Sequence, residues 1–92
     1  MMITFNTVQQ AIYDNAYTTY TSPNFTTDCL HHFLKEYETQ IELALECYYR
    51  FEDEERDSEI IQSAWNMYDT LRYYTWPVIK AIKDVLSERG KR

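Results

Sequence analysis

Glycine and proline are almost absent from this chain of 92 residues, which contains one glycine and two prolines. So few turn residues argue against a succession of short strands, because each chain reversal in such a fold needs them. Cysteine is also scarce. Cys29 and Cys47 are 18 residues apart on one expected helix, which at 1.5 Å per residue is about 27 Å and too far for a disulfide. Reduced thiols are typical of the cytoplasm, where we expect the protein.

Long apolar runs are missing as well. No stretch approaches the twenty residues that span a bilayer, and residues 1–12 lack the basic start of a signal peptide. Apolar residues nevertheless make up 45 % of the chain, which is too many for a disordered acidic tail. We therefore expect one domain, residues 1–92, with a core of modest size.

Basic residues are absent from residues 1–34. Residues 35–59 then hold ten of the fifteen acids and three bases, whereas residues 60–92 hold six bases and three acids. Like charges on one element repel each other and do not favour folding, so we interpret the acidic segment as a surface for a basic partner. The alternative is a solvated face that keeps a tyrosine-rich chain soluble.

The spacing of apolar residues predicts an all-α fold, a small bundle of three to four helices with one long central helix. The first helix is expected to start at Asn6 or Thr7, because Thr7 and Gln10 have the spacing of a capping box. Residues 16–21 are equally rich in the Thr and Tyr of strands, and residues 2–5 fit a short N-terminal strand.

The central helix is predicted over residues 27–51, with a cap at Thr26 or Thr27. Its apolar residues form an unbroken heptad seam: Leu30, Leu34, Tyr37, Ile41, Ala44, Tyr48 and Phe51. The seam fits either the core of a bundle within the chain or contact with a second copy. A turn is expected over residues 52–57. A third helix follows and is expected to end or kink at Trp76-Pro77, with a fourth helix from Pro77 to Gly90.

The candidate site is a set of carboxylates on and beyond this central helix. Three of them recur every fourth residue and therefore lie on one helical face, about 6 Å apart; four more follow in the expected turn. The set is Glu38, Glu42, Glu46, Glu52, Asp53, Glu54 and Glu55. Proteins hold nucleic acid through Lys and Arg, and a row of carboxylates can occupy such a groove. We predict that these residues bind a protein partner with a basic surface, without direct binding to nucleic acid or membrane.

Other chemistries have weaker support. Cys29, His32 and Glu36 share one helical side, but a structural zinc site needs four ligands and no second Cys/His cluster exists. A Cys/His pair without a third orienting group or an oxyanion motif does not make a nucleophilic site. We therefore expect no metal, no cofactor and no enzymatic activity. An aromatic cluster in the third helix is expected to be mostly core, with some members at a partner interface: Trp65, Tyr68, Tyr73, Tyr74 and Trp76.

A short, acidic, tyrosine-rich helical chain with little glycine resembles the bacteriophage inhibitors of host defence, the DNA-mimicking antirestriction and anti-CRISPR proteins. Residues 4–8 and 11–17 are similar to the opening of the overcome-classical-restriction protein of podophages. That family is acidic to its C-terminus, whereas this chain ends in Arg89-Gly90-Lys91-Arg92. The resemblance implies a non-enzymatic protein that binds a nuclease or effector complex, and it places no site residue.

Two functions fit these features. The leading one is a non-catalytic inhibitor that places its acidic helix face on the nucleic-acid site of a nuclease or CRISPR effector in the host cytoplasm. The alternative is a helical homodimeric adaptor, similar to an antitoxin, that uses the heptad seam.

Overall fold

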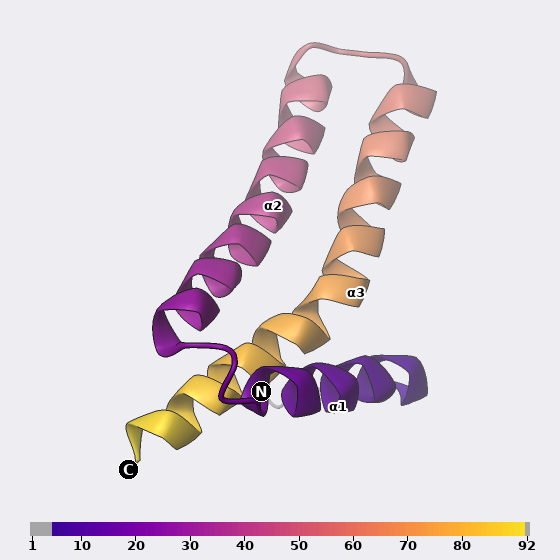
Figure 1. Ribbon diagram of the computed structural model, residues 1–92. Coiled ribbons are helices and arrows are strands. Elements are labelled where there is room, and N and C mark those ends of the chain that lie inside the picture. The colour runs from indigo at the N-terminus through magenta and orange to yellow at the C-terminus, as the bar shows by residue number, and fades with distance from the viewer. Residues whose placement is uncertain (1–4, 92) are drawn as a thin grey trace.

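The computed structural model describes residues 5–91, which form three α-helices and no strand. The helices are α1 (Thr7–Thr21), α2 (Thr27–Asp53) and α3 (Ser58–Gly90). Figure 1 shows α2 and α3 as an antiparallel hairpin, with α1 lying across the half of α3 that is farther from the hairpin turn. Both α1 and α2 pack extensively on α3. The all-α prediction is confirmed, while the strand expected at residues 2–5 lies outside the described residues apart from Phe5, which is in no strand.

Helix α1 begins at Thr7, as expected, but its capping box lies one residue earlier in the chain than predicted. The cap is Asn6, whose side chain accepts a hydrogen bond from the Gln9 backbone N–H at 2.8 Å. Gln9 Oε1 accepts in return from the Asn6 N–H at 3.3 Å. The prediction of a Thr7–Gln10 box was wrong because Asn is at least as good an N-cap as Thr and comes first in the chain. The alternative of a strand over residues 16–21 was also wrong, since these residues complete α1.

Helix α3 continues through Pro77, so the expected fourth helix is instead the C-terminal half of α3. A proline inside a helix removes the hydrogen bond to the carbonyl four residues earlier, here that of Tyr73. The side chain of Gln9 on α1 donates to this carbonyl at 3.1 Å and replaces the lost bond. The prediction that the helix ends at Trp76-Pro77 was wrong, because the missing donor comes from Gln9, 64 residues before Tyr73 in the sequence; the other expectation, a kink, fits the bend of α3. Figure 1 shows α3 changing direction part-way along, as an internal proline causes.

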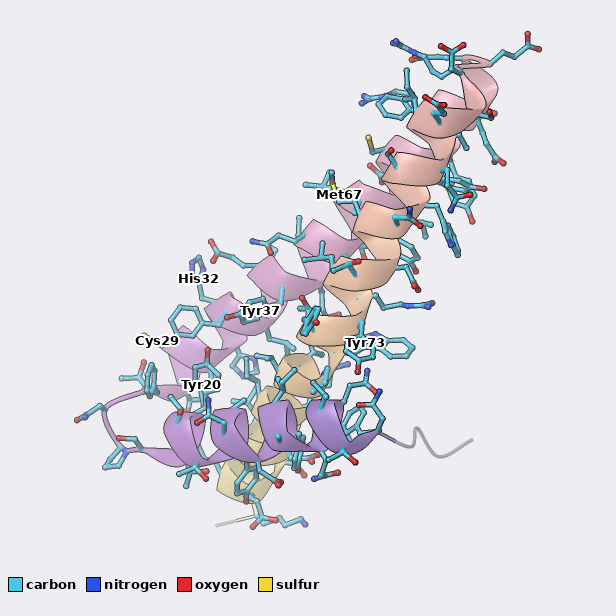
Figure 2. The ribbon with its side chains drawn as sticks, turned by 90° about the vertical axis from the view of Figure 1, so that its right-hand side faces the viewer. Tyr20, Cys29, His32, Tyr37, Met67 and Tyr73 are labelled. Atoms are coloured by element: carbon cyan, nitrogen blue, oxygen red, sulfur yellow. The ribbon has the colours of Figure 1, made fainter. Side chains whose placement is uncertain are left out.

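The core lies where the three helices meet. Its centre is Leu30 of α2 with Ile82 and Val85 of α3, all at most 3 % exposed. Around them pack half-buried side chains from α1, α2 and the loop before α2, which include Tyr20, Phe25, Phe33 and Tyr37. The hydroxyls of Tyr20 and Tyr37 lie 3.5 Å apart, and Figure 2 shows these residues facing each other across the junction of α1 and α2. The first half of the heptad seam is therefore buried within the chain.

The half of the hairpin next to the turn, residues 41–71, has only two helices. We call it the distal hairpin. Ala64 is the one residue in this range that is fully buried. Seam residues still face α3, as the 5.1 Å separation of the Tyr48 and Trp65 rings shows. Two helices can cover only one stripe of each other, so the distal hairpin carries much apolar surface that nothing in residues 5–91 covers.

Besides the bond from Gln9 to Tyr73, a polar cluster joins α1 to α3. The Tyr13 hydroxyl donates to Asp84, which also accepts from Lys80 Nζ at 2.6 Å. The hydrogen bond to Asp84, helped by burial, raises the pKa of Tyr13 to about 12. Burial alone would raise the pKa of Asp84, but the hydrogen bonds from Lys80 and Tyr13 outweigh it and lower that pKa.

The first prediction concerns the carbonyl freed by Pro77. Replacing Gln9 by Glu keeps the oxygen that caps α1 but removes the N–H donor to Tyr73, so the free energy of unfolding should fall by about 1–3 kcal/mol. Replacing Pro77 by Ala as well supplies a backbone N–H to the same carbonyl. The loss caused by Gln9→Glu should then be clearly smaller in the Pro77→Ala background, as urea unfolding of the four proteins in a double-mutant cycle can measure. Equal losses in both backgrounds would contradict this role for Gln9.

The second prediction concerns alkaline pH. A folded pKa of Tyr13 near 12, above the ordinary value of 10, stabilises the fold fully below pH 10, and this stability is lost as the pH rises through 12. Tyr13→Phe should therefore lower the Tm at pH 8 and show a smaller further decrease between pH 10 and 12 than the wild type. Tyr74→Phe, at an exposed position, is the control and should follow the wild-type profile. Parallel profiles for Tyr13→Phe and wild type would count against the Tyr13–Asp84 bond.

Candidate functional site

The three regularly spaced carboxylates lie on the exposed side of α2, as the sequence predicts. Glu38, Glu42 and Glu46 are all exposed. None of their side chains makes a hydrogen bond or ion pair with any of residues 5–91. We call these three residues the acidic row. Because no ion pair among residues 5–91 holds the row, a basic partner would not have to displace one to reach it.

The remaining acids surround the hairpin turn, at the opposite end of the molecule from the C-terminus (Figure 1). Glu52 and Asp53 form the last turn of α2, so the expectation that they belong to a turn was wrong; the turn itself begins at Glu54. The Tyr48 hydroxyl donates to Glu52 at 3.0 Å, and Arg56 pairs with Glu54 at 2.9 Å. Asp53 and Glu55 make no ion pair with the described part of the chain.

The turn has the hydrogen bonds of a Schellman motif. The N–H of Arg56 donates to the Phe51 carbonyl, and that of Glu55 donates to the Glu52 carbonyl, each at 3.1 Å. The guanidinium of Arg56 lies over the Phe51 ring, 5.4 Å from its centroid. This motif needs a left-handed residue after the helix, and Glu55 takes that role with φ of 52°. The turn is therefore well defined although it is highly charged.

An aromatic surface runs along the same flank of the hairpin as the acidic row. The Trp65 ring centroid lies 5.1 Å from that of Tyr48 and 5.4 Å from that of Tyr68. Arg72 continues the surface, with its guanidinium 5.4 Å from the Tyr68 ring and 5.5 Å from the Trp76 ring. Trp65 and Trp76 are partly exposed. Trp, Tyr and Arg side chains dominate the energy of many protein interfaces, so this aromatic flank fits a contact surface.

The acidic row and the aromatic flank lie on the same side of the hairpin because of helix geometry. At 100° per residue, Tyr49 lies about 20° from Glu42 around α2, on the side that faces the stripe in contact with α3. On α3 the corresponding flank carries Trp65 and Arg72, and the contact of Tyr48 with Trp65 joins the two helices there. The acidic row and the aromatic flank therefore lie on the same side of the hairpin, while α1 lies over the other end of α3.

The remaining candidates from the sequence do not form a site. His32 and Glu36 are 3.3 Å apart and both exposed, but residues 5–91 contain no cluster of three His, Cys, Asp or Glu side chains that could hold a metal ion. The bases of α3 serve largely within the chain. Lys80 pairs with Asp84, and Arg89 donates to Thr27 Oγ1 and to the Ser22 carbonyl.

Three exposed apolar residues of the distal hairpin were missed in the sequence: Leu43, Ile60 and Met67. Leu43 lies outside the heptad seam, and Met67 lies outside the spacing that turns α3 toward α2. An apolar residue that falls outside the buried stripe of a helix is the signal that would have found them, because it indicates a second contact surface.

The third prediction concerns Glu55. A side chain in the left-handed region costs about 1 kcal/mol, which glycine avoids. Glu55→Gly should therefore raise the free energy of unfolding by up to about 1 kcal/mol and also remove one of the crowded carboxylates. Glu54→Gly is the control for the loss of a negative charge, at φ of −79°; it also loses the ion pair with Arg56, and it should not stabilise the protein. Thermal unfolding of both variants decides this, and equal Tm changes would mean that charge alone is responsible.

None of the described helices is long and apolar enough to cross a membrane. Comparison with known proteins finds no matching family model, no similar curated protein and no similar solved structure.

Proposed function

We propose that the protein is a non-catalytic inhibitor of the phage anti-defence type, which binds the basic nucleic-acid site of a nuclease or CRISPR effector complex. The observation that carries the proposal is the unpaired acidic row beside the aromatic flank. Carboxylates at fixed spacing on a helix offer negative charge to a groove that is lined with Lys and Arg, as a phosphate backbone does. The adjoining Trp and Tyr side chains supply the apolar contact area that pure charge lacks.

The position of this surface on the molecule also supports the proposal. The distal hairpin extends away from the α1–α3 crossing, and the whole chain measures 51 × 28 × 24 Å. An elongated hairpin with acids along one flank and around its end can enter a nucleic-acid groove without a clash from the rest of the chain. Residues 38–59 contain nine acids and only two bases, Arg50 and Arg56, so the field at this end is strongly negative.

The fourth prediction tests the acidic row by removing its charge. Glu38, Glu42 and Glu46 are replaced together by Gln, and plasmid cleavage by a panel of restriction nucleases and CRISPR effector complexes is measured with increasing amounts of protein. The wild type should inhibit at least one of these enzymes, and inhibition should weaken steeply as salt rises. The Gln variant should inhibit at least about tenfold less, since each lost charge contact removes a few tenths to 1 kcal/mol or more.

The matched control carries the same change in net charge away from the row: Asp14→Asn, Glu36→Gln and Glu88→Gln. These three side chains are exposed and lie on other faces of the molecule, so the control should inhibit as the wild type does. The Gln variant should melt at the same temperature or higher, because like charges four residues apart repel by a few tenths of a kcal/mol per pair. Full inhibition by the Gln variant, or none by the wild type across the panel, would refute the proposed mechanism.

A further inference from the structure

The distal hairpin has an apolar groove on the flank opposite the acidic row. The groove has a volume of about 360 Å³. From α2 it is lined by Ala44, Cys47 and Phe51, and from α3 by Ile60, Ala64 and Met67, with Ser63 and Glu59 at its edge. We call it the distal groove. Glu59 is its one carboxylate, so the groove differs from the highly charged turn beside it.

One stripe of α3 is covered by α1 near its C-terminal end but is uncovered at the distal groove. Ile60, Met67, Tyr74 and Ala81 are spaced by seven residues and lie on one side of the helix. Ala81 is 0 % exposed, whereas Met67 is 67 % and Tyr74 is 54 % exposed. Helix α1 makes the difference, because its bonds to Tyr73 and Asp84 are made on either side of Ala81. Figure 2 shows Met67 well above α1, where no third helix covers the hairpin.

The chain as a whole exposes more surface than a compact monomer of its mass. A compact monomer of 11.2 kDa has an accessible surface of about 5,700 Å², whereas this chain has 6812 Å². The excess is of the same order as the ~800 Å² that each partner buries in a standard protein interface. The radius of gyration, 15.8 Å, also exceeds the ~12 Å of a compact domain of this length.

We propose that the distal groove is covered by the distal groove of a second copy of this chain, so that two hairpins form a four-helix bundle. A twofold interface places each patch against itself, which requires a patch that is apolar and carries little charge. The distal groove meets this requirement, whereas the acidic row, which would repel its own copy, does not. The two hairpins run antiparallel, because this keeps the two acidic turns at opposite ends of the bundle.

The dimer leaves the proposed inhibitory surface free. Glu42 and Cys47 are five residues apart, which places them about 140° from each other around α2. Burial of Cys47 between two copies therefore keeps both acidic rows and both aromatic flanks on the outside. The dimer does not depend on the inhibitor function, since its contacts are apolar and the contacts of that function are ionic.

The fifth prediction is the molecular mass in solution. Sedimentation velocity at up to about 100 μM should show a species of twice 11.2 kDa, with a dissociation constant of about 1 μM or lower. Met67→Glu should raise this constant by about 100-fold or more, because two copies of the charge would be buried in the groove. Met67 is exposed in the single chain, so its replacement should leave the circular dichroism spectrum unchanged. Val8→Glu is the matched control, since Val8 is an exposed apolar residue of α1, and it should still dimerise.

The two cysteines give a second readout within the wild-type protein. Cys47 lines the distal groove, while Cys29 is exposed near the start of α2. Raising the protein concentration through the dissociation constant should slow maleimide labelling of Cys47 and leave that of Cys29 unchanged. Raising salt to about 0.5 M should not dissociate the dimer, although it should abolish ionic binding of a nuclease. A single-chain mass at 100 μM, or an undiminished dimer of Met67→Glu, would overturn the proposal, and neither result would bear on the acidic row.

Discussion

The hydrogen bond from Gln9 to the carbonyl of Tyr73 is the contact on which the rest of this fold depends. Pro77 leaves that carbonyl without its helical partner, and an unsatisfied carbonyl beside a proline normally ends or sharply bends a helix. Because α1 supplies the missing donor, α3 continues for 33 residues. The same helix then fastens to Asp84 through Tyr13. Helix α3 can thus continue through Pro77 because α1 supplies the hydrogen bond that the proline removes.

Stability is distributed unevenly as a result. The end with three helices contains every fully buried large side chain, among them Leu30 and Ile82. The distal hairpin holds together through one row of contacts between two helices and a well-formed turn. Its carboxylates repel each other, and burial offsets little of that cost. A region of this kind opens more easily than the core, and a surface that binds a partner or a second copy is stabilised when it does so.

The sequence predicted those parts of the fold that depend on local patterns. The heptad seam predicted α2 to within two residues at its C-terminal end, and Thr26 caps it as expected because a side-chain oxygen before an apolar run is a local signal. Local rules failed at Pro77, since the donor that replaces its N–H is remote in sequence. For the site, spacing alone placed Glu38, Glu42 and Glu46 on one face. It could not show that they share a flank with Trp65, because that depends on how two helices rotate against each other, and it missed the exposure of Met67 for the same reason.

The absence of α1 from the distal hairpin makes the length of this region adjustable. The hydrogen bonds of α1 and its cap to α3 are made to Tyr73 and Asp84, outside residues 41–71, so α1 does not fix the length of this region. Adding or removing seven residues in each arm preserves the heptad register of the seam and moves the turn by about 10.5 Å along the axis. The distance between the core and the acidic turn can therefore change with the length of the two arms, while the core stays the same.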